Sequence, residues 1–334
     1  MKSPFTGVEM KLIKEKEILP YRKDEFEVCY LTFECEQTKE RFTTDALDLI
    51  NINQVHNLYR EKYGIPFPEE IKAIREKYEV SAKKMSEILG LGSNAYRLYE
   101  SGEMPSVSIG RLILSIKEPK EFRRQIGFSS HLLKDNESVK LLRIVEKLIE
   151  DTRDELKRIQ NAQYFYSTIN VNSGFKLLDF DKIGNVLSFF NSKNLGLFKT
   201  KVNKLLFYTD FLTYQRSGSS MLGITYRAIP FGPVPAEYET IYTKLISDNV
   251  IEIENVPIGN DFAQKFNSII PFDVTLFNEL ELGVLEEVAS RFYGKKTNEI
   301  VDISHEEKAW QENKDERKII DYSSYAFELY AFQK

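Results

Sequence analysis

The chain has 334 residues but only two cysteines, Cys29 and Cys35. Two cysteines cannot form a disulfide framework, so packing rather than covalent crosslinking has to stabilise the fold. No apolar run approaches the ~20 residues that a membrane-spanning helix needs. The N-terminal residues carry lysines among acidic residues and lack the apolar stretch of a signal peptide. These absences favour a soluble cytoplasmic protein without a membrane segment.

Catalytic signatures are scarce as well. HEEKA at His305 is not the HExxH motif of zinc proteases, because Ala309 stands in place of the second histidine. GKKT at Gly294 lacks the upstream glycine of a P-loop. Both cysteines lie far from His305 in the sequence, so no Cys/His pair is evident. We therefore expect a protein that is not an enzyme and that holds neither a metal nor another cofactor.

One acid–base group remains possible around His305. Asp302 and Glu306 lie close to it in the sequence, and carboxylates beside a histidine can transfer protons. The alternative is that His305 and Trp310, the single tryptophan, pack and hydrogen-bond inside a domain core. The second interpretation is favoured because an isolated histidine is more often structural than catalytic.

What the chain does contain is enough apolar material for several domains. Hydrophobic residues make up 42% and aromatic residues 13% of the sequence, so sizeable cores can be buried. The net charge of −5 argues against a generally basic coat for nucleic acid. Residues 67–126 differ from the rest, because eleven basic residues there outnumber nine acidic ones. A nucleic-acid contact, if present, is therefore expected in this segment.

The local patterns divide the chain into a β-rich start and a helical remainder. Short strands and turns are expected over residues 1–50, with one strand at Glu27–Glu36, where β-branched and aromatic residues gather. Apolar positions at helical spacing predict a helix over residues 45–63. Pro66 and Pro68 break that helix and allow a new one to start. A run of short helices follows over residues 69–126.

Two of these short helices are separated by Gly90 and Gly92, which is typical of a helix-turn-helix. Ser81 is expected to cap the first helix, and Ser93 the second, which ends near Gly102. A recognition helix places its N-terminal residues at the base edges of DNA. The alternative is a small helical bundle without a role in DNA binding.

Five residues of this segment are candidate DNA contacts. The amide of Asn94 can pair bidentately with adenine, and Arg97 can reach a guanine or a phosphate. Ser93 stands beside them at the start of the helix. Lys83 and Lys84 are expected to hold the phosphate backbone.

Residues 136–165 form one long helical pattern. Its inward positions alternate by three and four residues, and they are Leu142, Val145, Ile149, Thr152, Leu156, Ile159 and Gln163. Three to four such heptads predict a coiled-coil-like stalk, which could dimerise the chain. The alternative is a helix that lies on its own domain.

The start of the chain has the shape of a zinc knuckle without its cysteines. In SPFTG, Ser3 and Thr6 stand where a CPxCG knuckle has its ligands, and Cys35 and Thr38 repeat the spacing. Structural zinc requires thiolate or imidazole ligands, and a hydroxyl is a poor substitute. We therefore expect no zinc, with hydroxyl hydrogen bonds and packing in its place. A Ser-Pro turn of unrelated origin is the alternative.

This N-terminal half resembles the MqsA-type antitoxins, which begin with a CPxCG knuckle, strands and a second CxxC before a helix-turn-helix. EILGLG, NAY and YESG within residues 81–106 also resemble the wider Xre-like regulators. In that family an arginine commonly follows the asparagine by four residues. Here that position is Leu98, and Arg97 lies about 100° away around the helix. The resemblance implies DNA binding, but not the family's operator sequence.

The C-terminal half carries a second resemblance. KLLFYTDFLTYQRSGSSMLG, YRAIPFGPVPAEYETIY, ELGVLEEV and SHEEKAW occur in order between residues 178 and 326. This series is similar to the Panacea domain, also called the SocA-like or GepA-like antitoxin-associated domain. It implies a type II antitoxin that binds and neutralises a co-encoded toxin, often one that blocks translation. Some relatives deliver the toxin to a protease instead.

The toxin-binding surface is expected at the turn of this domain. Aromatic residues anchor protein interfaces, but they also build cores, and most of those between residues 207 and 242 are expected in the core. The residues expected to be exposed and to bind the toxin are Phe231, Pro233, Pro235 and Tyr238.

The expected fold is mainly α and multidomain (α+β), in four parts. Residues 1–66 form a degenerate zinc-knuckle-like domain, 67–126 a helix-turn-helix domain, 127–170 a helical linker, and 171–334 a mostly helical Panacea domain with a small β element. The expected partners are a toxin, operator DNA and a second copy of the chain. The alternative function is a transcriptional regulator or protease adaptor without a dedicated toxin.

Overall fold

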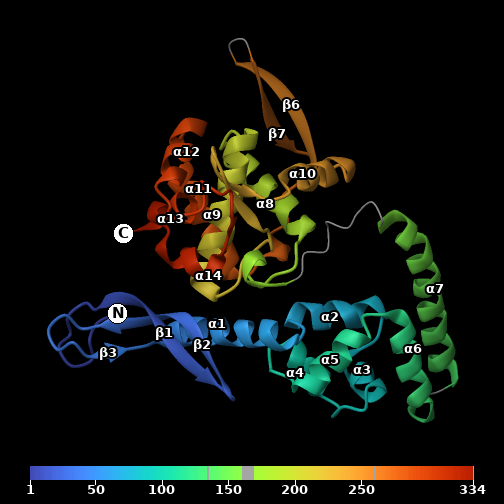
Figure 1. Ribbon diagram of the computed structural model, residues 1–334. Coiled ribbons are helices and arrows are strands. Elements are labelled where there is room, and N and C mark those ends of the chain that lie inside the picture. The colour runs from blue at the N-terminus through green and yellow to red at the C-terminus, as the bar shows by residue number, and fades with distance from the viewer. Residues whose placement is uncertain (134, 160–168, 259–260, 334) are drawn as a thin grey trace. The chain divides into compact units, whose positions relative to one another are not determined.

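The computed structural model describes residues 1–133, 135–159, 169–258 and 261–333. In these residues the fold is mainly helical, with three small antiparallel sheets (Figure 1). The chain divides into two compact units: unit 1 combines residues 1–55 with 168–334, and unit 2 comprises residues 56–167. The expectation of a mainly α multidomain protein is confirmed, whereas the division into four named domains stays a prediction.

The N-terminal sheet of unit 1 is a long hairpin. Strands β1 (Lys11–Tyr21) and β2 (Asp24–Glu34) pair antiparallel over their whole length, and β3 (Arg41–Phe42) adds to β2. The predicted strand at Glu27–Glu36 is present but begins earlier, and strands of eleven residues are not the short strands expected. The sequence hid β1 because none of its side chains is buried, which removes the apolar alternation.

Helix α1 (Asp45–Tyr63) confirms the helix predicted over residues 45–63. Its first half packs on β2 through two side-chain amides. Asn51 accepts the N–H of Leu31 at 2.9 Å and donates to the same residue's carbonyl at 3.0 Å. Gln54 pairs with the backbone of Cys29 in the same way, at 3.1 and 2.9 Å. These amides continue the β ladder beyond the strand, so backbone groups buried under α1 keep their hydrogen bonds.

Unit 2 contains the predicted run of short helices. They are α2 (Pro68–Lys77), α3 (Ala82–Ile88), α4 (Ala95–Glu100), α5 (Val107–Ser115) and α6 (Pro119–Phe128), followed by the 3₁₀ turn η1 (Ser130–Leu132). Pro68 occupies the first turn of α2, as expected for a residue without a backbone N–H. The helices enclose one apolar core that includes Ile71, Tyr78, Met85 and Tyr96.

Helix α7 (Asp135–Ile159) follows at the end of unit 2. Leu141 and Val145 are buried in the core of the short helices, and Leu148 and Ile149 pack against it. For this first part of the helix, the alternative of a helix lying on its own domain is confirmed. The side chains of residues 150–159 and all of residues 160–168 lie outside the description, including the predicted stalk positions Thr152, Leu156, Ile159 and Gln163.

The C-terminal part of unit 1 surrounds one buried helix. Helix α9 (Lys199–Ser217) is central in Figure 1, and residues 201–214 are all buried. A helix buried on every side has no solvent face and therefore no amphipathic stripe. Around it lie α8 (Phe180–Ser192), α10 (Tyr238–Ser247), α11 (Glu279–Phe292), α12 (Thr297–His305), α13 (Lys308–Gln311) and α14 (Tyr322–Tyr325).

Two small sheets complete this part. Strand β4 (Tyr226–Ile229) lies between β5 (Gly232–Pro235) and β8 (Ile319–Ile320), while β6 (Ile251–Ile258) and β7 (Asp261–Ser268) form a separate hairpin. Short 3₁₀ turns are η2 (Val171–Ser173), η3 (Val274–Leu276), η4 (Ala326–Glu328) and η5 (Tyr330–Phe332). Among the described residues, none of the helices combines the length and apolarity needed to cross a bilayer.

Candidate DNA-binding and partner-binding surfaces

The two knuckle-like turns at the start of the chain have the same backbone geometry. The N–H of Gly7 donates to the carbonyl of Ser3 at 2.9 Å, and the N–H of Lys39 donates to that of Cys35 at 2.8 Å. Gly7 and Lys39 both adopt positive φ, at 70° and 60°. The N–H of Ser3 donates to the carbonyl of Val8 at 2.8 Å, and the N–H of Cys35 donates to that of Glu40 at 3.0 Å. The match supports the interpretation of SPFTG and CEQT as paired turns.

The paired turns meet through a thiol and hydroxyl groups. The Thr6 hydroxyl lies 3.4 Å from the sulfur of Cys35, which is fully buried. Hydrogen bonds from Thr38, followed by those from Thr6, lower the pKa of the Cys35 thiol. Ser3 directs its hydroxyl inward to accept the N–H groups of Phe5 and Thr6, both at 3.3 Å. Hydrogen bonds thus join the two turns where a knuckle would have thiolates.

The recognition helix of the predicted helix-turn-helix is held from two sides. The N–H of Tyr96 donates to the hydroxyl of Ser86 on α3 at 3.1 Å, and the Tyr96 hydroxyl donates to the Ile71 carbonyl at 2.8 Å. At the far end of α4, Glu100 forms a largely buried ion pair with Arg75 at 2.5 Å. These contacts orient α4 and leave its other face to solvent.

Three of the predicted DNA contacts lie together on that solvent face. Ser93, Asn94 and Arg97 are all exposed at the start of α4. The prediction that Ser93 caps the helix is wrong: α4 begins at Ala95, with Asn94 at the N-cap position and no capping bond from its side chain. Ser93 lies one residue before the N-cap position, so its side chain does not cap the first free N–H groups of α4. The Ser81 cap is confirmed by a 3.2 Å bond from the Lys84 N–H.

The two lysines predicted to contact phosphate differ in their exposure and ion pairing. Lys83 on α3 is exposed. Lys84 is only partly exposed and pairs with Glu87 at 2.9 Å and with Glu137 at 3.3 Å. Two carboxylates beside one ammonium group offset its positive charge, so Lys83 is the better candidate for a phosphate contact.

The turn between β4 and β5 exposes only part of the surface predicted for a toxin. Phe231 at its tip is 68% exposed, and Tyr238 is half-buried. The prediction that Pro233 and Pro235 are exposed is wrong, because all four residues of β5 are buried. Strand β5 packs on α9, where the ammonium group of Lys204 donates to the Pro233 carbonyl at 2.8 Å. The sequence could not reveal that α9 covers β5, because the contact joins residues 29 positions apart.

The aromatic residues expected in the core are there. Phe207, Phe211, Tyr226 and Tyr322 form one cluster, with the rings of Phe211 and Tyr322 stacked at 4.2 Å. Tyr208, Tyr214 and Tyr242 are buried as well. Large rings with few rotamers give this part a rigid interior.

His305 and Trp310 pack against each other. Their rings stack at 3.9 Å, and the indole N–H of Trp310 donates to the Ile229 carbonyl on β4 at 2.7 Å. Burial, and after it the charge of Lys204, lowers the pKa of His305. Asp302 and Glu306 are exposed. The arrangement supports the packing interpretation of the two rings.

A buried carboxylate in α9 is a feature that the sequence analysis missed. Asp210 is fully buried and accepts the N–H groups of Met221 and Leu222, at 2.9 and 2.6 Å. The hydroxyls of Tyr226 and Tyr322 donate to its other oxygen at 2.9 and 3.2 Å. Burial raises the pKa of Asp210 to about 7, against the effect of these donors. The available signal was a single Asp within the largely apolar stretch LLFYTDFLTY of α9.

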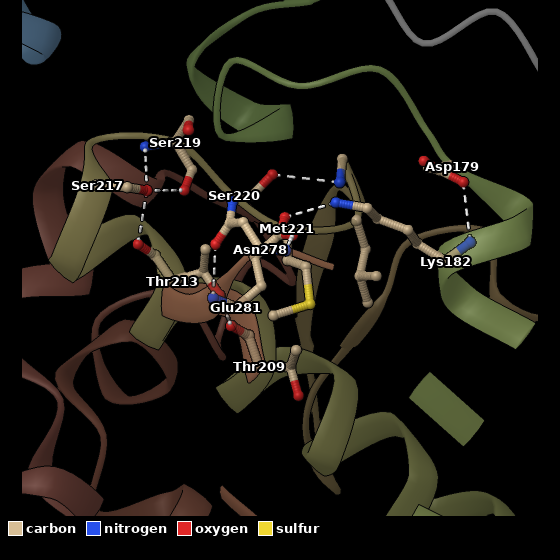
Figure 2. Close-up of polar contacts among 12 residues, drawn as sticks. Asp179, Lys182, Thr209, Thr213, Ser217, Ser219, Ser220, Met221, Asn278 and Glu281 are labelled. Atoms are coloured by element: carbon tan, nitrogen blue, oxygen red, sulfur yellow. Dashed lines mark hydrogen bonds and ion pairs between the residues drawn. The ribbon is translucent and has the colours of Figure 1, made fainter. Parts of the chain in front are cut away.

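The loop that Asp210 holds is bordered by further polar contacts, drawn in Figure 2. Ser217 donates to the Thr213 carbonyl at 2.9 Å. Lys182 of α8 and Glu281 of α11 form a largely buried ion pair at 2.5 Å, and Asn278 caps the same turn of α11. The ion pair joins α8 to α11, and the cap satisfies the first N–H groups of α11 itself.

Comparison with known proteins finds a family match within this C-terminal part. The family model described as antitoxin SocA-like, Panacea domain, matches residues 202–311. The match includes most of α9, the β4–β5 turn and the His305–Trp310 stack. It supports a C-terminal Panacea domain and a role related to toxin–antitoxin systems. No curated protein matches the chain.

Proposed function

We propose that this chain is the antitoxin of a type II toxin–antitoxin system, and that its Panacea domain binds a co-encoded protein toxin without catalysis. The family match at residues 202–311 carries the proposal. The exposed ring of Phe231 at the tip of the β4–β5 turn supports it, because exposed aromatic side chains often anchor protein interfaces. A toxin that blocks translation is the class that the family resemblance suggests.

Co-expression with the neighbouring gene tests this proposal. The neighbour alone should stop growth, and the full chain should restore it and co-purify with the neighbour's product. Phe231→Glu should weaken rescue and complex formation, since a charge would replace the anchor. Tyr293→Glu is the matched control, because Tyr293 is 70% exposed elsewhere on the same domain. A neighbour without toxicity, or rescue without a complex, would favour the regulator or adaptor alternative.

We further propose that unit 2 binds the promoter of its own operon, as a homodimer reading two half-sites about one helical turn apart. Asn94 and Arg97 side by side on the solvent face of α4 support this role. Asn94→Ala should lose the preference for promoter DNA over random DNA. Lys83→Ala should weaken binding to both and reduce the salt dependence.

Lys120→Ala serves as the control for the lysine variant, since Lys120 is an exposed lysine of α6, outside the two helices of the motif. Titration of labelled promoter and random duplexes at two salt concentrations separates the effects. Equal binding of both duplexes by the wild-type chain, or wild-type binding by Asn94→Ala, would refute sequence reading by α4.

His305→Ala tests the remaining enzymatic alternative. On the proposed function it should affect stability and not neutralisation by the folded chain, because His305 stacks on Trp310. Loss of neutralisation in a folded variant that still binds the toxin would favour catalysis.

A further inference from the structure

The hairpin of β6 and β7 is joined to the rest of its domain along the β7 edge. The N–H of Phe266 on β7 donates to the Leu197 carbonyl at 2.8 Å, and Phe198 and Lys265 form an antiparallel bridge. Strand β6 pairs with β7 and with no other strand of the described chain. Figure 1 shows the hairpin extending beyond the helices that surround α9. The outer edge of β6 is therefore open.

The ladder fixes which backbone groups of β6 point outward. In an antiparallel strand the N–H and C=O of one residue point to the same side, and successive residues alternate. The N–H of Ile269 donates to the Val250 carbonyl at 2.9 Å, so even-numbered residues of β6 face β7. Phe266, the register partner of Ile253, directs its N–H away from β6, which gives the same result. Odd-numbered residues of β6 therefore point their backbone groups away from β7.

Ile253 and Asn255 carry the open hydrogen-bonding groups of this edge. Among the described residues, neither their N–H groups nor their carbonyls have a hydrogen-bond partner. Pro257 occupies the next outward position, where a residue without an N–H is tolerated because the ladder to β7 loses no bond. The edge thus offers two N–H donors and two C=O acceptors in line, which is a template for a further strand.

The side chains of β6 define the chemistry of a strand that fits. Glu252 and Glu254 lie on one face and are exposed, while Ile253 lies on the other face and is half-buried. Glu254 pairs with Lys265 at 3.5 Å, and Glu252 has no ion-pair partner in the described part of the chain. Opposite charges on neighbouring strands stabilise their pairing. A fitting strand therefore has lysine or arginine on one face and an apolar residue beside Ile253 on the other.

A second copy of β6 does not have this chemistry. Antiparallel pairing centred on Ile253 would place Glu252 of each copy opposite Glu254 of the other, and like charges in that position repel each other. Pairing centred on Asn255 would place Pro257 opposite Ile253, whose carbonyl would then face a residue without an N–H. The edge therefore favours a segment of a different protein.

We propose that the outer edge of β6 binds an extended segment of another protein, in which basic and apolar residues alternate. Backbone hydrogen bonds to Ile253 and Asn255 supply the pairing, as in other complexes that add a strand to an open sheet edge. Glu252 and Glu254 select for a basic face. This inference goes beyond the proposed function and does not depend on the toxin.

A peptide of alternating lysine and valine, KVKVKV, tests the edge on the full chain. Residue-resolved amide hydrogen exchange is the measurement, because it distinguishes the outward N–H groups from those bonded to β7. Without peptide, Ile253 and Asn255 should exchange fast, and Glu252 and Glu254 slowly. When peptide occupies about nine-tenths of the chain, exchange at Ile253 and Asn255 should slow about tenfold, because only the free fraction exchanges.

Two further peptides separate strand pairing from attraction between charges. KKKVVV has the same composition and charge without the alternation, and EVEVEV has the alternation with the opposite charge. Neither should slow exchange at Ile253 or Asn255. Equal protection by either peptide, or no protection by KVKVKV at millimolar concentration, would overturn the proposal. Protection that appears without peptide and grows with protein concentration would identify a second copy as the occupant and would overturn it as well.

Proline variants locate the contact on β6. Asn255→Pro removes an outward N–H while the bonds to β7 remain, so it should abolish the protection of Ile253 by KVKVKV. Gln264→Pro is the matched control, because Gln264 is the register partner of Asn255 and its N–H points away from β6. Its protection by peptide should equal that of the wild-type chain. Unchanged protection in Asn255→Pro would contradict the proposal. If this variant loses the slow exchange of Glu252, the hairpin itself has opened and the three peptides on the wild-type chain decide.

Charge variants test the selection for a basic face. Replacing both glutamates, Glu252→Gln with Glu254→Gln, should weaken KVKVKV binding about fivefold, because two favourable cross-strand charge pairs are lost. Glu279→Gln is the control, since Glu279 is an exposed residue at the start of α11. Equal binding by the double variant and the control would refute the role of the two glutamates.

Discussion

The hydroxyl of Thr6 and the thiol of Cys35 lie 3.4 Å apart, although 29 positions separate them in the sequence. Each belongs to a turn of the same backbone geometry, and their contact joins the two turns. A hydrogen-bonded contact thus links the two turns at positions where the predicted resemblance to a zinc knuckle has metal ligands.

Cysteines at the other three knuckle-like positions should create a zinc site. A chain with Ser3→Cys, Thr6→Cys and Thr38→Cys keeps Cys35 as the fourth ligand and should bind one zinc ion, because two like turns present four thiolates. Metal content after dialysis measures this. The same chain with Cys35→Ser is the control and should retain much less zinc. A folded triple variant without zinc would show that the turns are not spaced as a knuckle.

Asp210→Asn should destabilise unit 1 by about 3 kcal/mol or more, because a neutral amide cannot accept all four donors that meet the carboxylate. Urea unfolding measures the loss. Asp248→Asn on α10 is the control, since Asp248 is an exposed residue that pairs with Lys244, and its effect should stay below about 1 kcal/mol. Equal stability of the two variants would mean that Asp210 does not organise the loop.

Lys204 makes stability depend on pH. Burial lowers the pKa of Lys204 to about 7 in the folded chain, against about 10.5 when it is exposed. Between these values the unfolded chain binds more protons, so the contribution of Lys204 to stability rises with pH and is lost as pH falls through 7. The charge of Lys204 in turn lowers the pKa of His305.

Lys204→Met removes this dependence. The stability of the wild-type chain relative to Lys204→Met should rise by about 2 kcal/mol from pH 6.5 to 9, as measured by urea unfolding at each pH. A difference that stays constant over this range would mean that Lys204 keeps its charge in the folded chain.

Gly232→Ala should lower the free energy of unfolding by about 2 kcal/mol or more. Gly232 has a φ of 93°, and an added Cβ would strike the Ser304 hydroxyl and lie 2.8 Å from Nζ of Lys204. Gly283→Ala on the exposed side of α11 meets nothing within 4 Å and should stabilise the helix by up to about 1 kcal/mol. Thermal unfolding of both variants measures the two changes in stability. Melting temperatures that shift in the same direction would contradict the prediction.

The sequence predicted well those features that depend on nearby residues. Ser81 caps α3 as expected, and Pro68 starts α2, because caps and first turns are decided within about four residues. The paired turns at Ser3 and Cys35 followed from their spacing. The long β1 was missed because an exposed strand has no apolar alternation to read.

Burial and the partners of buried groups were decided by the tertiary structure alone. Pro233 and Pro235 have a turn-like sequence, yet α9 covers them. The donors of Asp210 come from up to 112 positions away, and Glu307 accepts the N–H groups of Tyr330 and Ala331, which lie 23 and 24 positions later. Local sequence determines backbone turns through steric and capping preferences, whereas the solvent exposure of a residue depends on distant segments that only the folded chain brings together.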